Sequence, residues 1–204
     1  MTSSKPFILA LCTALLGTSA SAADFSDPSW PYIQRKVERL SVGLMWPEPI
    51  PETELDPDLA DDVADLAGTL ALRRVTLEDA KAAVEEFAAD HGKDPALMGQ
   101  VFQAVFDRMS QRRRQIISGI EDYSLGQIAL TERIEETRVK MTTLMDADAP
   151  DYDQVDALEE QLDWDERIYT DRQKALTYVC ESPVLLEQRL YALAEILQAA
   201  GSDG

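Results

Sequence analysis

Residues 155–197 read VDALEEQLDWDERIYTDRQKALTYVCESPVLLEQRLYALAEIL, and this stretch decides the fold. Alternating steps of three and four residues from its first valine reach mostly apolar side chains over about six heptads, which predicts a long coiled-coil helix. The seam positions are Val155, Leu158, Leu162, Asp165, Tyr169, Arg172, Leu176, Val179, Pro183, Leu186, Leu190, Leu193 and Leu197. Asp165 and Arg172 form a polar layer in the seam, and Ser182-Pro183 predicts a kink or a restart of the helix.

A second helix of similar length precedes this seam. The chain has no proline from Ala96 to Ala149, and apolar residues recur there at helical spacing. Residues 146–153 contain Pro150 and are typical of a tight turn. A short turn between two long helices makes them antiparallel neighbours. We therefore expect an all-α protein built on an elongated hairpin of about 95–146 and 152–198, followed by a flexible tail at 199–204.

Capping signals upstream predict two shorter helices. Asp56-Pro57 and Asp94-Pro95 each pair an N-cap with a proline in the first turn. Thr76 and Asp79 form a capping box, and Gly92 is a helix stop. We expect the first short helix to end near Arg73 and the second near His91. Residues 57–198 are then a single helical domain, preceded by an irregular arm at 23–56 that is rich in tryptophan and proline.

The first residues have the order of a secretory signal peptide. Lys5 is followed by an apolar run of about ten residues and by Ala20-Ser21-Ala22, which resembles a cleavage site. We expect residues 1–22 to be removed, with cleavage after Ala23 as the alternative. A lipoprotein signal centred on Cys12 is a weaker interpretation, because bulky Leu11 precedes it where a small residue is needed. The signal predicts export to the periplasm.

The charge balance limits the classes of partner that suit the chain. Without residues 1–22 the chain keeps 18 basic and 38 acidic side chains, a net charge of −20. Nucleic acid and anionic lipid should repel such a chain, whereas neutral or basic protein surfaces suit it. The alternative is that the charge only maintains solubility. We also expect no membrane span, since no stretch after the signal approaches 18 consecutive apolar residues.

Few residues are candidates for catalysis or metal binding. Cys180 is the only cysteine left after removal of the signal, and it is either a buried apolar residue or an intermolecular thiol. His91 is the only histidine, so a zinc site within one chain is not expected. The turn at residues 146–153 is rich in aspartate, which calcium sites use. It lacks the glycine and the terminal glutamate of the known calcium-binding loop. We expect no catalytic residues, no metal ligands and no cofactor.

Six residues are candidates for interaction. Trp30 and Trp46 either staple the arm to the helical body or anchor a partner, because aromatic residues dominate interface hot spots. A basic cluster stands out in the acidic chain and either pairs internally or binds an acidic partner or a second copy. Its members are Arg108, Arg112, Arg113 and Arg114.

These features favour a protein that acts by binding. The leading hypothesis is an exported periplasmic helical protein that is not an enzyme and serves as an adaptor or accessory subunit of a cell-envelope complex. Its partner would be an unknown protein of the envelope, with a homodimer as a further candidate. One alternative is a periplasmic holdase-type chaperone, and another is an enzyme or small-ligand binder with a pocket between helices.

Overall fold

The computed structural model describes residues 27–30 and 36–202, so the predicted signal peptide lies outside the described residues. Its helices are η1 (Val42–Leu44), α1 (Pro57–Leu70), α2 (Leu77–His91), α3 (Pro95–Met145) and α4 (Tyr152–Ser202). The described residues contain no strand, which confirms the all-α prediction.

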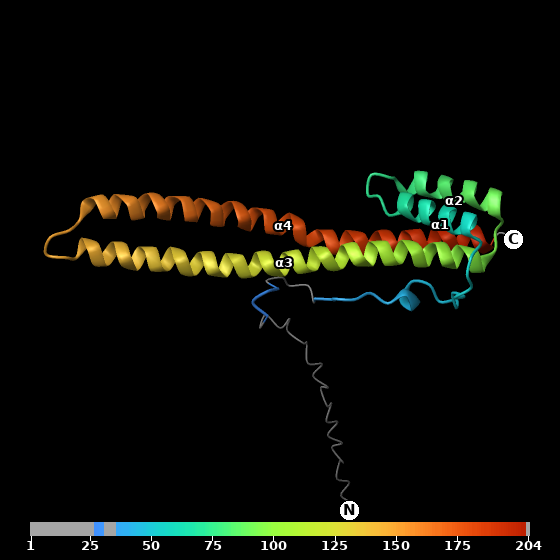
Figure 1. Ribbon diagram of the computed structural model, residues 1–204, viewed down its shortest axis with the longest axis horizontal. Coiled ribbons are helices and arrows are strands. Elements are labelled where there is room, and N and C mark those ends of the chain that lie inside the picture. Colours follow the sequence, from blue (N-terminus) through green and yellow to red (C-terminus); the bar gives the residue numbers. More distant parts are fainter. Residues whose placement is uncertain (1–26, 31–35, 203–204) are drawn as a thin grey trace, which may run out of the picture.

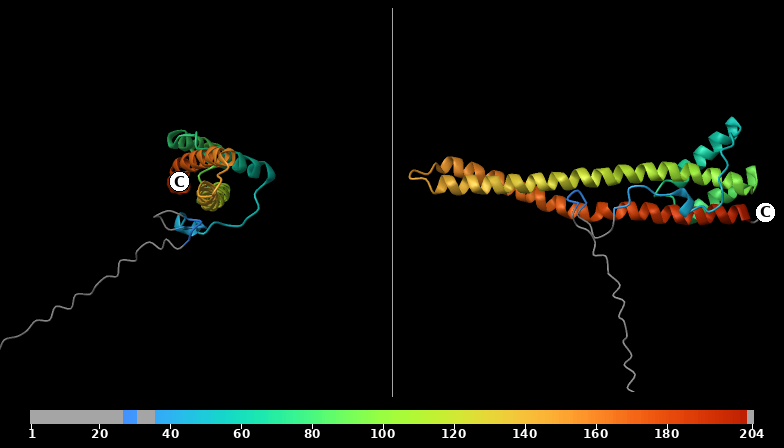
Figure 2. Two further views of the ribbon diagram at one scale, coloured as in Figure 1. Left: turned by 90° about the vertical axis from the view of Figure 1, so that its left-hand side faces the viewer. Right: turned by 90° about the horizontal axis from the view of Figure 1, so that it is seen from below.

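The two long helices lie side by side and antiparallel along their whole length (Figure 1). α1 and α2 pack on one side of this hairpin, at the end where the C-terminus lies, and the arm at residues 36–56 runs along the opposite side (Figure 2). We call this three-layered end the proximal half. The distal half, residues 122–182, is a hairpin that extends beyond α1 and α2 to the turn near Pro150.

Each predicted helix start has its N-cap. In each case an Asp or Thr side-chain oxygen accepts a backbone N–H from the first helical turn. The pairs are Asp58 N to Asp56 Oδ1 at 3.1 Å, Asp79 N to Thr76 Oγ1 at 3.0 Å, Ala96 N to Asp94 Oδ1 at 3.0 Å and Gln154 N to Asp151 Oδ1 at 3.2 Å. At the other end of α2, Gly92 has a φ of 90°, a conformation that glycine adopts without strain.

The cap of α2 gives a first testable expectation. Thr76→Ala should lower the free energy of unfolding by about 1 kcal/mol, because one N–H of the first turn loses its acceptor. Urea denaturation measures this. Thr170→Ala is the matched control, since Thr170 is an exposed threonine in the middle of α4 and its loss should change stability by less than about 0.5 kcal/mol. Equal effects of the two changes would contradict the capping role.

The main core lies in the proximal half, where α1, α2, the arm and both long helices meet. Its largest fully buried side chains there include Leu70, Val84, Met98, Phe102, Leu190, Leu193 and Leu197. Trp46 of the arm joins this core and stacks on Phe102, with ring centroids 5.1 Å apart. The arm approaches α3 closely at Gly99, where an added Cβ would lie 3.3 Å from both Ile50 Cγ1 and Trp46 Nε1. The arm is therefore part of the folded core.

Two boundaries differ from the sequence-based expectations, whereas the bent course of α4 agrees with the predicted kink. α1 ends at Leu70 rather than near Arg73. α4 passes through Pro183 as one bent helix, and its bend lies where the orange ribbon turns red (Figure 1). The expected flexible tail is helical as far as Ser202, because Gly201 is buried against α3. A Cβ at Gly201 would lie 3.2 Å from Pro95 Cα, so glycine permits this close approach.

Candidate interaction surface

The seam of the distal half is unusually polar. Asp165 is only 5% exposed, and Arg133 of α3 reaches it with two bonds, one of them Nε to Oδ2 at 2.7 Å. This bond raises the pKa of Arg133, although burial of its charge opposes the shift. Gln127 Nε2 donates to Tyr169 O at 3.1 Å, while Gln127 Oε1 is buried without a partner. The distal helices therefore share less apolar contact than the proximal ones.

One stripe of α4 residues faces the α1–α2 side of the hairpin. In the proximal half Ala192, Ile196 and Ala199 line a groove together with residues of α2. Arg189 belongs to the same stripe and donates from Nε and Nη2 to Leu70 O of α1, at 3.1 and 2.8 Å. α1 and α2 thus cover this stripe as far as the loop that joins them.

Beyond that loop the stripe continues at heptad spacing without α1 and α2 over it. Its residues there are Leu185, Ser182, Tyr178, Ala175, Asp171, Ile168, Trp164, Gln161 and Ala157. Tyr178 is 77% exposed and Trp164 58% exposed, and Leu185 and Ile168 are also substantially exposed. Exposed large apolar side chains that line up on one face mark interaction sites more often than isolated ones do.

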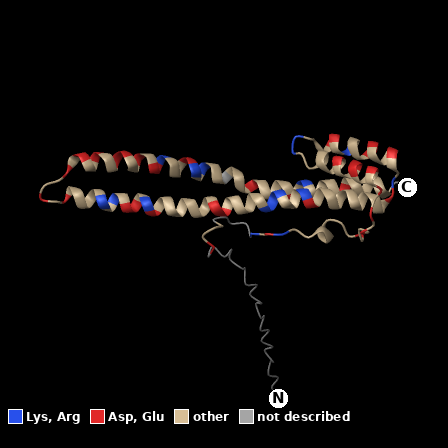
Figure 3. Cartoon of the chain, in the orientation of Figure 1, with Lys and Arg blue, Asp and Glu red and all other residues tan. Residues whose placement is uncertain are grey.

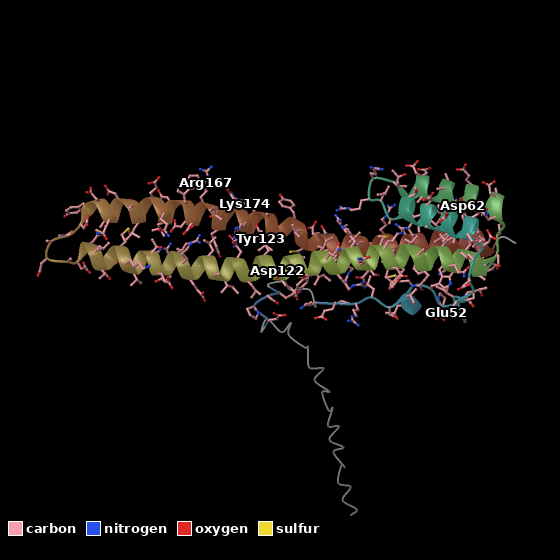
Figure 4. All side chains as sticks on the ribbon, in the orientation of Figure 1. Glu52, Asp62, Asp122, Tyr123, Arg167 and Lys174 are labelled. Atoms are coloured by element: carbon pink, nitrogen blue, oxygen red, sulfur yellow. The ribbon has the colours of Figure 1, made fainter. Side chains whose placement is uncertain are left out.

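α3 contributes the other side of this surface. Tyr123, Gly126 and Ala129 follow one another at helical spacing, and Figure 4 places Tyr123 between the long helices in mid-hairpin. The Arg172 guanidinium lies over the Tyr123 ring, 5.7 Å from its centroid. A Cβ on Gly126 would lie 3.9 Å from Arg172 Nη1, so Arg172 leaves the seam and crosses α3 at this glycine.

Near the tip, a groove joins the two helices on the same side. Lys140 and Thr143 of α3 line it together with Gln154 and Ala157 of α4. We call the whole surface, from Leu185 to Gln154 on α4 and from Tyr123 to Thr143 on α3, the open face. It combines Trp, Tyr and Arg side chains, the types most enriched at interface hot spots.

Charge is distributed unevenly along the hairpin (Figure 3). Residues 144–166 contain no Lys or Arg. Their acidic residues are Asp146, Asp148, Asp151, Asp153, Asp156, Glu159, Glu160, Asp163, Asp165 and Glu166. At the opposite end of the open face, the α1–α2 loop carries the exposed Arg73 and Arg74, and Arg112 of α3 is also exposed. On α4 the open face therefore ends in an acidic tip, whereas α3 carries Arg133, Arg138 and Lys140 in the same part of the hairpin.

The two candidate tryptophans have different surroundings. Trp46 is buried in the core, which agrees with the interpretation that it fixes the arm to the helical body. Its indole is therefore covered by the chain's own residues. Trp30 is half-buried, and its backbone N–H donates to Asp27 O at 3.0 Å.

The four candidate arginines also separate. Arg113 is buried and donates from Nη1 to Val37 O of the arm at 2.6 Å, with Glu187 3.7 Å from Nη2. Burial lowers the pKa of Arg113, and the charge of Glu187 opposes the shift. Arg108 donates to Ala64 O of α1 at 3.2 Å, so these two arginines tie the arm and α1 to α3. Arg112 and Arg114 are exposed.

The candidate thiol lies away from the open face. Cys180 follows Val179 on the opposite flank of the α4 seam, and its Sγ–H donates to Leu176 O at 2.8 Å. His91 stacks at a tilt on Phe87 and places Nε2 3.3 Å from Asp62 Oδ2, which links α2 to α1. Both contacts belong to the local packing of helices.

Trp164, Ile168 and Tyr178 are not among the interaction candidates that the sequence alone suggests. The signal was present in the sequence, because these residues repeat at heptad spacing one position before the seam residues Asp165, Tyr169 and Val179. A second apolar heptad stripe beside the first is typical of a helix with two buried faces. On α4 the proximal part of that second stripe is covered and the distal part is open.

Within residues 27–30 and 36–202, no three His, Cys, Asp or Glu side chains gather as metal ligands would. No helix in those ranges has a stretch long and apolar enough to cross a membrane.

Comparison with known proteins adds no relative. The sequence matches no protein-family model, and neither the curated proteins nor the solved structures gave a match.

Proposed function

We propose that this is an exported, periplasmic protein that acts by binding another protein through the open face, as an accessory subunit of a cell-envelope assembly. The observation that supports this most directly is the exposure of Trp164, Tyr178 and Ile168 on a stripe whose proximal part is covered by α1 and α2. Burying the exposed apolar area of these side chains would contribute about 25 cal/mol per Å². A docked helix or helix pair is the simplest structure that completes such a face.

The composition of the open face also favours a protein as occupant. Its aromatic side chains have few rotatable bonds, so little conformational entropy is lost when they are buried. The Arg172 guanidinium lies on Tyr123 and presents a planar group already held in place. The strongly acidic tip adds a preference for a partner with a basic surface at that end.

The test uses the tagged protein in its own cells. Chemical cross-linking followed by native gel analysis should show a complex larger than one chain for the unmodified protein. The double substitution Trp164→Ala and Tyr178→Ala should reduce that complex at least about tenfold, since hot-spot losses reach 2 kcal/mol or more each. Fractionation of the same cells checks the periplasmic location.

Tyr191→Ala is the matched control. Tyr191 is also an exposed aromatic residue of α4 but lies in the proximal half, outside the open face. Its substitution should leave the complex intact. If the double variant assembles as well as the control, the open face is not the binding surface and the proposal is wrong.

A further inference from the structure

We infer that the open face binds a second copy of this chain, in an antiparallel pair related by a two-fold axis near Ile168. This inference rests on the proposed function and names the partner. Two distal hairpins placed face to face would form a four-helix bundle, in which each hairpin supplies the layer that α1 and α2 supply in the proximal half.

The dimensions of the open face fit a copy of itself. On α4 it extends from Gln154 near the tip to Leu185 beside the α1–α2 loop, about 47 Å at ~1.5 Å per residue. Two helices about 10 Å wide give a face of roughly 1,000 Å². A stable interface buries about 800 Å² per partner, so self-association along the whole face reaches that size.

The α1–α2 loop fixes the register. It ends the open face on the proximal side, so a hairpin docked antiparallel places its tip against the partner's loop. Ile168 is the large apolar residue of the stripe that lies nearest the midpoint between Gln154 and Leu185 in the sequence. A two-fold axis at that point makes Ile168 its own partner across the interface.

The same axis pairs the two most distinctive side chains. Trp164 and Arg172 lie four residues before and four residues after Ile168, so Trp164 of each copy meets Arg172 of the other. Arg172 is already spread over Tyr123 beside Gly126, where the missing side chain leaves room for an indole. A guanidinium between two aromatic rings is a favourable cation–π arrangement.

Charge complementarity favours this orientation over a parallel one. The turn of the acidic tip, with Asp146, Asp148 and Asp151, would lie against the partner's Arg73 and Arg74 at the basic end of its open face. A parallel pair would place tip against tip and bring the two sets of carboxylates together, which costs several kcal/mol. The antiparallel order therefore brings the turn aspartates of each copy next to the loop arginines of the other.

Cysteine cross-linking of the purified protein tests the axis, in a Cys180→Ser background and with oxidised glutathione as the oxidant. Ile168→Cys should form an intermolecular disulfide, because residues at the axis can reach the required Cα separation of about 4.4–6.8 Å. Tyr178→Cys should not, since antiparallel pairing separates the two copies of this position. Thr170→Cys, exposed on the other flank of α4, is the negative control.

Each outcome decides. A disulfide at 168 without one at 178 supports the antiparallel dimer, and disulfides at both positions show a parallel pair and overturn it. Sedimentation equilibrium gives the second readout: Ile168→Asp should weaken self-association at least about 100-fold by placing two carboxylates at the axis, and Thr170→Asp should not. A protein that stays monomeric without any substitution overturns the inference.

The failure of the inference can be told from the failure of the proposed function. A photo-reactive amino acid at position 168 in cells should give an adduct of twice the chain's mass. An adduct with a different protein, together with a monomeric purified chain, would overturn the dimer and keep the binding role of the open face. The absence of any adduct would overturn both.

Discussion

Replacing Trp46 with alanine should lower the free energy of unfolding by about 3–5 kcal/mol, the range for removing a large aromatic side chain from a core. Trp46 is 5% exposed and stacks on Phe102, so its loss leaves a cavity between the arm and α3. The neighbouring arm would also lose its deepest anchor. Urea denaturation followed by circular dichroism at the helical band measures the change.

Leu44→Ala is the control on the same arm. Leu44 is 76% exposed only two residues away, so its removal should cost less than about 0.5 kcal/mol. A Trp46→Ala protein as stable as the Leu44→Ala protein would show that the arm adds nothing to the core, contrary to the packing at Gly99.

Substitutions of Arg133 and of Asp165 should change the stability of the distal hairpin in opposite directions. Removing the cation with Arg133→Ala leaves Asp165 buried in the seam without its two donors, which destabilises the distal hairpin. We expect amide hydrogen-exchange protection near residues 130–134 and 162–168 to fall by about one order of magnitude. The loss is smaller than for a fully buried ion pair, because Arg133 itself is half exposed.

Asp165→Leu should instead raise protection in the same segments. The leucine restores the apolar seam position, and the released Arg133 can reach water because its side chain is already 53% exposed. Arg138→Ala is the matched control, since Arg138 bonds the exposed Glu166 rather than a seam residue, and we expect little change. Loss of protection in the Asp165→Leu protein would mean that the ion pair stabilises the hairpin more than a packed leucine does.

Local signals in the sequence predicted the helix starts and the helical class. Asp56, Thr76 and Asp94 cap helices because their side chains satisfy N–H groups a few residues away, a contact that needs no tertiary structure. The heptad seam predicted α4 for a similar reason, because its spacing alone decides which residues share a face.

Contacts between distant segments were not predictable in the same way. The polar seam position Asp165 was visible in the sequence, but its partner Arg133 depends on the register between α3 and α4. That register is set by the turn and by the sum of packing contacts. Likewise, Trp46 and Trp30 look alike in the sequence, and only the position of Gly99 on α3 identifies the indole that enters the core.

The end of α4 illustrates a different difficulty. Gly201 lies in the stretch 199–204, for which the sequence predicts a flexible tail, and glycine disfavours helix. In the structure glycine is needed there for another reason, namely that the backbone of Pro95 lies too close for a side chain. Composition gives no means of separating a glycine that ends a helix from one that packs against a neighbouring backbone.

The placement of the arm has a consequence for the order in which the chain folds. Gln198 Nε2 donates to Met45 O, a contact that spans 153 residues, and Arg189 closes a separation of 119 residues to Leu70. The proximal core therefore combines residues of the arm with residues near the end of α4. It cannot be completed until almost the whole chain is available. The α3–α4 tip needs only neighbours in sequence, so it should form first and bring the two ends together as it lengthens.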